Sequence, residues 1–177
     1  MDRRRFIGIG LAAAATLLPV PAWAKPRSAE RSLSFLHLHT GERLKAVYYA
    51  EGRYLPNALK QINHLLRDYR VDEEKPVSPE LLDLLSALDR HLETGAPFEV
   101  LSAYRSAETN AMLSQRTRGV AKRSLHMEAK AIDIRIPGIR TSDIARVARA
   151  LQSGGVGYYP RHDFVHVDVG DVRTWTA

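Results

Sequence analysis

Two short segments in the second half of the chain place ionisable side chains inside apolar runs. They are Ala131-Ile132-Asp133-Ile134 and Val165-His166-Val167-Asp168-Val169. Each run predicts a buried strand, and strand alternation puts His166 and Asp168 on one face and the valines on the other. A charged group inside such a strand costs free energy unless it is paired or bound to a cation. Any fold of this chain must therefore supply partners to these strands.

A loop histidine completes a set of candidate metal ligands, His126, Asp133 and His166. The 177 residues include no cysteine, which excludes disulfides, thiolate metal sites and cysteine nucleophiles, so a metal would have to be held by His, Asp or Glu. Three protein ligands with an open fourth position are the layout of a catalytic zinc. The alternative is structural, with Asp133 paired to Arg105 or Arg135 and the histidines hydrogen-bonded in the core. Spacing alone leaves both open.

Residue periodicity predicts one α+β domain, in which helices come first and a small, mostly antiparallel sheet follows. We expect a hairpin of strands over 33–39 and 43–49, and further strands over 98–103, 131–136, 156–159 and 164–169. We expect helices over 57–69, 78–92, 107–118 and 141–152. The predicted helix caps are Ser78 and either Thr141 or Ser142.

Residues 1–24 have the order of an export signal. Three arginines at 3–5 precede a short apolar run, and Ala22-Trp23-Ala24 provides a small-x-small cleavage site. The arginines followed by Phe6-Ile7 resemble a twin-arginine signal, the bacterial route for folded proteins. A general secretion signal and an uncleaved anchor are the alternatives. Cleavage after Ala24 would leave one domain, residues 25–177, in the periplasm without stable membrane insertion.

Composition limits the partners. With 45% apolar and 26% charged residues, the chain has the balance of a globular protein, which excludes a disordered chain or a polytopic membrane protein. The formal net charge of +6 falls to +4 once residues 1–24 are removed, because they hold three arginines and one aspartate. A mildly basic exported domain is not expected to bind nucleic acid, whereas Lys122 and Arg123 in the loop 119–125 favour a carboxylate-rich substrate.

Three blocks of the chain stand out: Ser102-Ala103-Tyr104-Arg105-Ser106, the stretch 124–133 from Ser124-Leu125-His126 to Ala131-Ile132-Asp133, and Asp163-Phe164-Val165-His166-Val167-Asp168. Together they resemble the zinc D-Ala-D-Ala metallopeptidase superfamily, and within it the YcbK/MepK murein endopeptidases. The likeness runs from about Leu33 to Trp175. It implies a Hedgehog/DD-peptidase-like fold and one Zn²⁺ per chain held by His126, Asp133 and His166. It also implies Arg105 as the partner of the oxyanion and Asp163 as the general base, with His162 and Asp168 as competitors for proton transfer or support.

The resemblance implies an enzyme that cleaves peptide cross-links in murein, including those between two diaminopimelate residues. A D,D- or L,D-carboxypeptidase acting on stem peptides is the runner-up, and a non-catalytic peptidoglycan-binding module is a second alternative. We expect a monomer whose partners are peptidoglycan stem peptides. The branch usually has glycine where this chain has Ala103 and Ala129, and alanine adds strain of about 1 kcal/mol if either position needs a positive φ.

Overall fold

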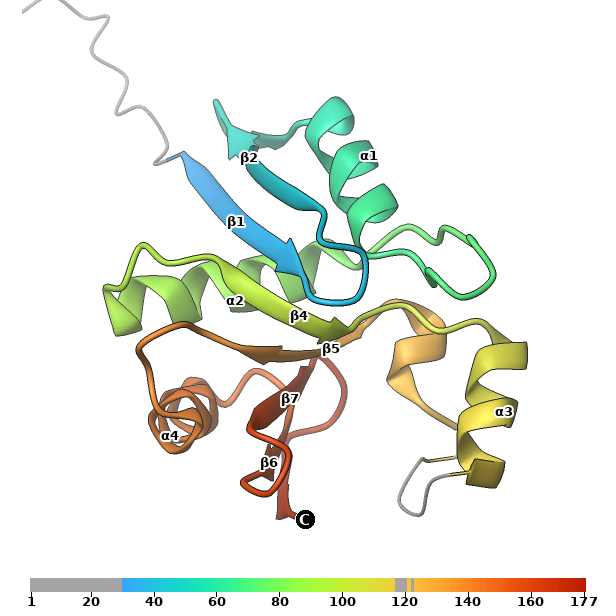
Figure 1. Cartoon of the computed structure of the whole chain (residues 1–177). Coiled ribbons are helices and arrows are strands. Elements are labelled where there is room, and N and C mark those ends of the chain that lie inside the picture. Colours follow the sequence, from blue (N-terminus) through green and yellow to red (C-terminus); the bar gives the residue numbers. More distant parts are fainter. Residues whose placement is uncertain (1–29, 117–120, 122) are drawn as a thin grey trace, which may run out of the picture.

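The computed structural model describes residues 30–116, 121 and 123–177, which form one eight-stranded sheet with helices packed on it (Figure 1). The strands are β1 (Arg31–His37), β2 (Arg43–Ala50), β3 (Arg53–Tyr54), β4 (Phe98–Ser102), β5 (Ala131–Arg135), β6 (Gly155–Tyr159), β7 (Phe164–Asp168) and β8 (Arg173–Thr176). Their order across the sheet is β3-β2-β1-β4-β5-β7-β6-β8. The pairs β1–β4 and β6–β8 are parallel and the other neighbours antiparallel, which confirms an α+β fold with a mostly antiparallel sheet.

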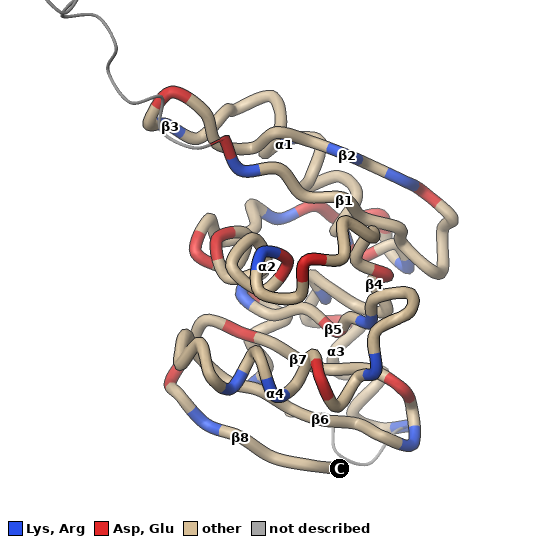
Figure 2. The backbone as a smooth tube through the Cα atoms, turned by 90° about the vertical axis from the view of Figure 1, so that its left-hand side faces the viewer, with Lys and Arg blue, Asp and Glu red and all other residues tan. Residues whose placement is uncertain are grey.

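The helices are α1 (Pro56–Leu65), α2 (Pro79–Leu92), α3 (Ala107–Arg116) and α4 (Thr141–Leu151), with a 3₁₀ turn, η1 (Leu125–Glu128), before β5. Helix α1 contacts β2, α2 contacts β1 and α4, and α4 contacts β6 and β7. Figure 2 shows α2 and α4 on the same side of the strands. Helix α2 buries one leucine-rich face, in keeping with its spacing of apolar residues.

The two faces of the central strands differ in chemistry because side chains alternate along a strand. Four residues, Ile132, Ile134, Val165 and Val167, are fully buried in the same core as the apolar residues of α4. The residues between them, including Asp133 and His166, therefore lie on the opposite face of the sheet. The fold thus separates an apolar face under the helices from a polar face, and the candidate site lies on the polar face.

Several boundary predictions were wrong. The helices do not precede the sheet, since β1 and β2 come first, and the sheet is larger than expected because β3 and β8 were not predicted. Helix α1 ends at Leu65 rather than at 69, because the chain turns there and Asp68 binds the segment before α3 instead of continuing the helix. At α4 the N-cap is Arg140, and the hydroxyl of Thr141 donates to Asp163 rather than capping the helix.

The expected export signal and its cleavage site lie outside the described residues, as do 117–120 and Lys122 in and beside the basic loop. Within the described part of the chain, no helix is long and apolar enough to cross a membrane.

Candidate metal centre

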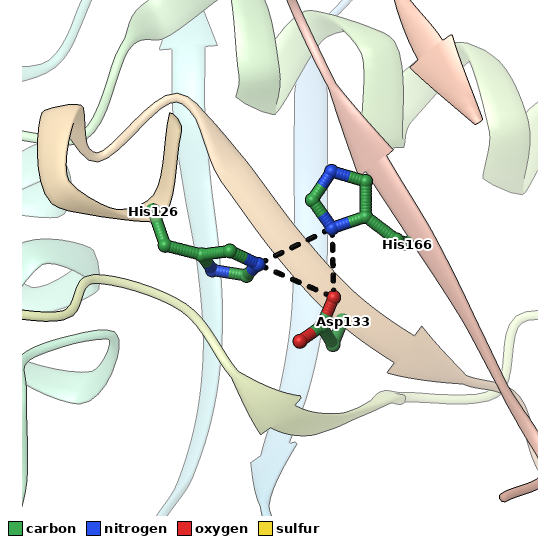
Figure 3. Close-up of side chains that lie close together, drawn as sticks. All are labelled: His126, Asp133 and His166. Carbon is green, nitrogen blue, oxygen red and sulfur yellow. Dashed lines mark hydrogen bonds and ion pairs between the residues drawn. The ribbon is translucent and has the colours of Figure 1, made fainter. Parts of the chain in front are cut away.

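Three side chains from three different elements meet on the polar face of the sheet (Figure 3). His126 comes from η1, Asp133 from β5 and His166 from β7, and all three are buried. His126 Nε2 lies 3.2 Å from His166 Nδ1 and 3.3 Å from Asp133 Oδ1, and His166 Nδ1 lies 2.9 Å from the same oxygen. One donor atom of each residue therefore faces a common point, and the group could hold a metal ion.

The outer nitrogen of each imidazole has an acceptor of its own, which fixes the direction of the inner one. His126 Nδ1 lies 2.6 Å from the carbonyl oxygen of Ala103, and His166 Nε2 lies 2.9 Å from Asp168 Oδ2. Because a carbonyl or carboxylate oxygen only accepts, these nitrogens carry the protons and donate. The lone pair of His126 then lies on Nε2, and that of His166 lies on Nδ1 once a cation takes the place of its second proton, which is the arrangement typical of metal-ligating histidines.

Asp168 is a fully buried carboxylate that supports His166 from behind. Besides His166, it accepts hydrogen bonds from the backbone N–H groups of Gly155 and Gly170, at 3.0 and 2.9 Å. Both terminal nitrogens of Arg173 also donate to it, at 3.0 and 2.6 Å. Burial would raise the pKa of Asp168, but these donors hold it well below its usual range. Asp168 is thus committed to orienting His166 and does not face the open side of the site.

The charge states of the cluster suit a cation. Burial alone would raise the pKa of Asp133, but His126 and His166 beside it hold that pKa far below its usual range. Burial lowers the pKa of His126. At neutral pH Asp133 is therefore a carboxylate and His126 a neutral imidazole, which are the forms that bind metal. The pKa of His166, lowered by burial but raised more strongly by Asp133 and Asp168, is about 9 in the absence of a cation.

Arg105 adjoins the cluster. Its Nη2 donates to Asp133 Oδ2 at 3.0 Å, its Nε to the hydroxyl of Ser102 at 2.9 Å, and its backbone N–H to the carbonyl of His126 at 3.2 Å. The sequence left pairing of Asp133 with Arg105 as an alternative to a metal site, but the structure contains both the pair and the cluster. Asp133 Oδ1 faces the two histidines, and Asp133 Oδ2 faces Arg105. Asp133 makes no such pair with Arg135, which binds Glu99 instead.

Asp163 is not brought to the cluster. It lies in the turn between β6 and β7 with φ +50°, where its Oδ1 accepts from Thr141 at 3.1 Å and its Oδ2 lies 3.9 Å from Arg135 Nη1. Its side chain is 66% exposed. His162, in the same turn, has its ring 6.4 Å from that of Phe164. None of the polar contacts made by Asp163 reaches the three candidate ligands.

Ala103 and Ala129, which stand where the resembled branch usually has glycine, differ in backbone conformation. Ala129, at the end of η1, has φ +52°, in the left-handed region that costs a non-glycine residue about 1–2 kcal/mol. Ala103 is not among the described residues with positive φ, and its carbonyl holds His126. The expected strain therefore exists at Ala129 alone. Ser124 accepts a hydrogen bond from the backbone N–H of His126 at 3.4 Å.

Sequence reasoning assigned no role to two residues that shape the site. Asp68 is fully buried, and its Oδ2 accepts from both the backbone N–H and the hydroxyl of Ser106 at 2.9 Å, which fixes the residue next to Arg105. Trp175 on β8 lies across Gly157, with its ring centroid 5.2 Å from that of His166. A charged residue after an apolar helix was a usable signal for Asp68, whereas a short exposed strand gives little signal for Trp175.

A separate surface cavity lies between β2 and α1, lined by Glu42, Arg43, Leu44, Lys60, Gln61, His64, Leu65 and Glu74. None of the candidate ligands lines it. Two of its carboxylates are already paired, Glu42 with Arg67 and Glu74 with His64. The cluster on the polar face is therefore the candidate functional site, and this cavity is not.

Comparisons with known proteins match this chain over nearly its whole length. The family model described as Peptidoglycan L,D-endopeptidase MepK matches residues 25–175. The chain is 43% identical over 178 residues to the "Peptidoglycan L,D-endopeptidase MepK" of Escherichia coli strain K12, a match that covers 98% of this chain and 97% of the relative. It is 38% identical over 177 residues to the "Probable peptidoglycan L,D-endopeptidase MepK" of Haemophilus influenzae, covering 98% of this chain and 95% of the relative.

Proposed function

Because the chain belongs to the family described as Peptidoglycan L,D-endopeptidase MepK, we propose that it is a zinc-dependent endopeptidase that hydrolyses peptide cross-links in peptidoglycan. The observation that carries the proposal is the meeting of His126, Asp133 and His166 beside the cation of Arg105. A module that only binds peptidoglycan would need neither feature. We infer further that the fold is of the Hedgehog/DD-peptidase type.

The residues present fit zinc. Two neutral imidazoles and one carboxylate are a donor set that catalytic zinc sites use, and with no cysteine in the chain a thiolate site is excluded. His126, Asp133 and His166 would hold one ion per chain. When bound, zinc supplies positive charge that polarises an amide carbonyl and lowers the pKa of a water molecule toward neutrality.

Arg105 places a fixed positive charge next to the proposed ligands. The side chain of Arg105 is 11% exposed, and its guanidinium is held by Ser102 and Asp133, so it is oriented before a substrate arrives. A preorganised cation of this kind stabilises negative charge that develops on the carbonyl oxygen in the transition state. We assign Arg105 this role in amide hydrolysis.

We propose Asp163 as the general base that takes a proton from the attacking water and delivers it to the leaving amine. It lies three residues before His166, and its exposed side chain would have to leave Thr141 and Arg135 to act. Asp163→Ala is expected to keep zinc and lose about a hundredfold in kcat. The measurement is the initial rate of dimer cleavage with metal content determined in parallel. Near-full activity of Asp163→Ala, with loss in His162→Ala, would move the assignment to His162.

The proposed substrate is a cross-link between stem peptides, with links between two diaminopimelate residues preferred over links through D-alanine. The experiment is digestion of both kinds of defined dimer by the protein of residues 25–177, analysed by chromatography and mass spectrometry. Cleavage of dimers into monomers with intact glycan is expected. Release of terminal residues without dimer cleavage would support the carboxypeptidase alternative, and retention on insoluble peptidoglycan without bond cleavage the binding module.

We propose export by the twin-arginine route, with residues 1–24 as the cleaved signal and the periplasm as the site of action. The motivation is the order Arg-Arg-Arg-Phe-Ile at residues 3–7, together with a metal-loaded domain that profits from folding before transport. The double variant Arg3→Lys, Arg4→Lys should leave the uncleaved precursor in the cytoplasm, as seen by fractionation and immunoblotting. Arg27→Lys, beyond the cleavage site, is the control. Undiminished export of the double variant would assign the protein to the general secretion route.

A further inference from the structure

The row of residues that crosses the sheet at the candidate metal centre is closed on one side. The register aligns Asp133 with His166, His166 with Gly157, and Gly157 with Trp175. In the next row toward the start of β5, Ala131 faces Asp168 and Gly155 faces Arg173, and the buried carboxylate of Asp168 is bonded to that arginine. Since the residues on this side bind and support His166, the row on the opposite side of the ligands is the candidate surface for a substrate.

The row on the other side is half-open and carries four side chains, Glu99, Arg135, Phe164 and Tyr159, which we term the charged–aromatic row. Glu99 is aligned with Arg135, and Phe164 with Tyr159. The antiparallel register of β5 and β7, continued by one residue from Ile134 and Val165, places Arg135 opposite Phe164. All four side chains are partly exposed, in contrast to the buried row of the ligands.

The charged half of the row is an ion pair between Glu99 and Arg135 that leaves further hydrogen-bonding groups of both side chains for a ligand. Arg135 Nε donates to Glu99 Oε2 at 2.6 Å, while its Nη1 lies 3.9 Å from Asp163 and beyond hydrogen-bond distance of it. The side chain of Arg135 is 39% exposed and that of Glu99 is 18% exposed. A pair this exposed contributes little to folding stability. Its terminal guanidinium nitrogens remain available to a carboxylate from outside, and Glu99 to an ammonium group.

The aromatic half is a fixed apolar surface next to the ligands. The rings of Tyr159 and Phe164 stack with centroids 4.3 Å apart, and Trp175 Nε1 donates to the Tyr159 hydroxyl at 3.0 Å. These contacts join the row to the tryptophan that flanks His166. Methylene groups can pack against such rings while the charged end of the same side chain reaches Arg135.

We propose that the charged–aromatic row binds the substrate residue next to the scissile bond, and that Glu99 and Arg135 recognise a side chain ending in both an ammonium and a carboxylate group. The inference rests on the proposed function, and it assigns recognition of the diaminopimelate substrate proposed there to two residues, Glu99 and Arg135. The Cα atoms of Asp133 and Arg135, two residues apart on one strand, are about 6.6 Å apart. In diaminopimelate, three methylenes join the two amino-acid centres, which therefore lie roughly 5 Å apart. This length is similar to the spacing between the row of the ligands and the charged–aromatic row.

The test measures binding of a stem tripeptide ending in diaminopimelate, and of the same tripeptide with the distal carboxylate amidated, by titration calorimetry on the zinc-loaded protein. The wild type should bind the free acid at least about tenfold more tightly, because a charge-assisted contact to Arg135 is lost on amidation. Arg135→Gln should remove this preference. Arg146→Gln, which changes an exposed arginine of α4, is the matched control and should keep it.

Equal binding of both peptides by the wild type, or a preference that survives Arg135→Gln, would overturn the inference. Glu99→Gln gives an independent readout, since it should raise KM for dimers with a free distal amine about tenfold and leave KM for N-acetylated dimers unchanged. A protein that cleaves dimers but does not prefer the free-acid tripeptide contradicts only the role of the charged–aromatic row. A protein that binds the free-acid tripeptide more tightly than the amidated one but cleaves no dimer contradicts only the proposed function.

Discussion

Replacing His126, Asp133 or His166 by alanine should remove the bound metal and abolish hydrolysis. Each residue supplies one of three donor atoms that lie 2.9–3.3 Å apart, so removal of one leaves two ligands, too few for a tightly held zinc. We expect about one zinc per chain in the wild type and less than about a tenth of that in each variant after dialysis. Elemental analysis and the rate of dimer cleavage are the measurements.

Two exposed histidines of the helices, His64 and His91, serve as matched controls, because neither lies near the cluster. Their alanine variants should keep full zinc and full activity. Retention of stoichiometric zinc by all three ligand variants would contradict the site. Loss of zinc with unchanged hydrolysis would contradict its role in catalysis.

Arg105→Ala should separate catalysis from metal binding. The guanidinium contacts Asp133 through Oδ2, whereas the cluster uses Oδ1, so zinc should stay bound. Loss of a preorganised charge partner of the oxyanion commonly lowers kcat by about 10²–10³-fold. We expect this loss in kcat with metal content near one per chain, and partial recovery in Arg105→Lys, which restores the charge but not the planar fork.

Arg70→Ala is the matched control, since Arg70 also lies beside a buried carboxylate, Asp68, at 3.9 Å, but away from the cluster. It should leave kcat within about twofold, the size of an ordinary surface substitution. An Arg105→Ala protein with wild-type kcat would remove Arg105 from the mechanism. Loss of zinc in that variant would show that it holds Asp133 in place instead.

Strands and helices with a clear periodic pattern of apolar residues were predictable from the sequence. Elements whose existence or ends depend on tertiary contacts were not. The apolar periodicity of α2 and of β5 and β7 is local, and it matches the structure within a few residues. Strand β8 was missed because its pairing with β6 is parallel and distant from any turn signal. The end of α1 was missed because Asp68 is drawn to Ser106, a contact that spans 38 residues.

The candidate ligands were predictable because a buried strand with a charged residue needs a partner. That argument singled out Asp133 and His166, and a loop histidine completed the set with His126. The family resemblance added the role of Arg105, which the structure brings to the same point. The position of Asp163 was not predictable, since its contacts with Thr141 and Arg135 depend on how α4 packs beside the turn. Spacing from His166 says nothing about such packing.

The most direct measurement of the central claim is a metal depletion and restoration series on a dimer linked through diaminopimelate. The protein of residues 25–177 is stripped with a chelator, dialysed and titrated with zinc while monomer release is followed by mass spectrometry. We predict that hydrolysis stops on depletion and returns in proportion to zinc, reaching its plateau at one equivalent per chain. Undiminished cleavage by fully depleted protein, or no cleavage after zinc is restored to one equivalent, would contradict the account.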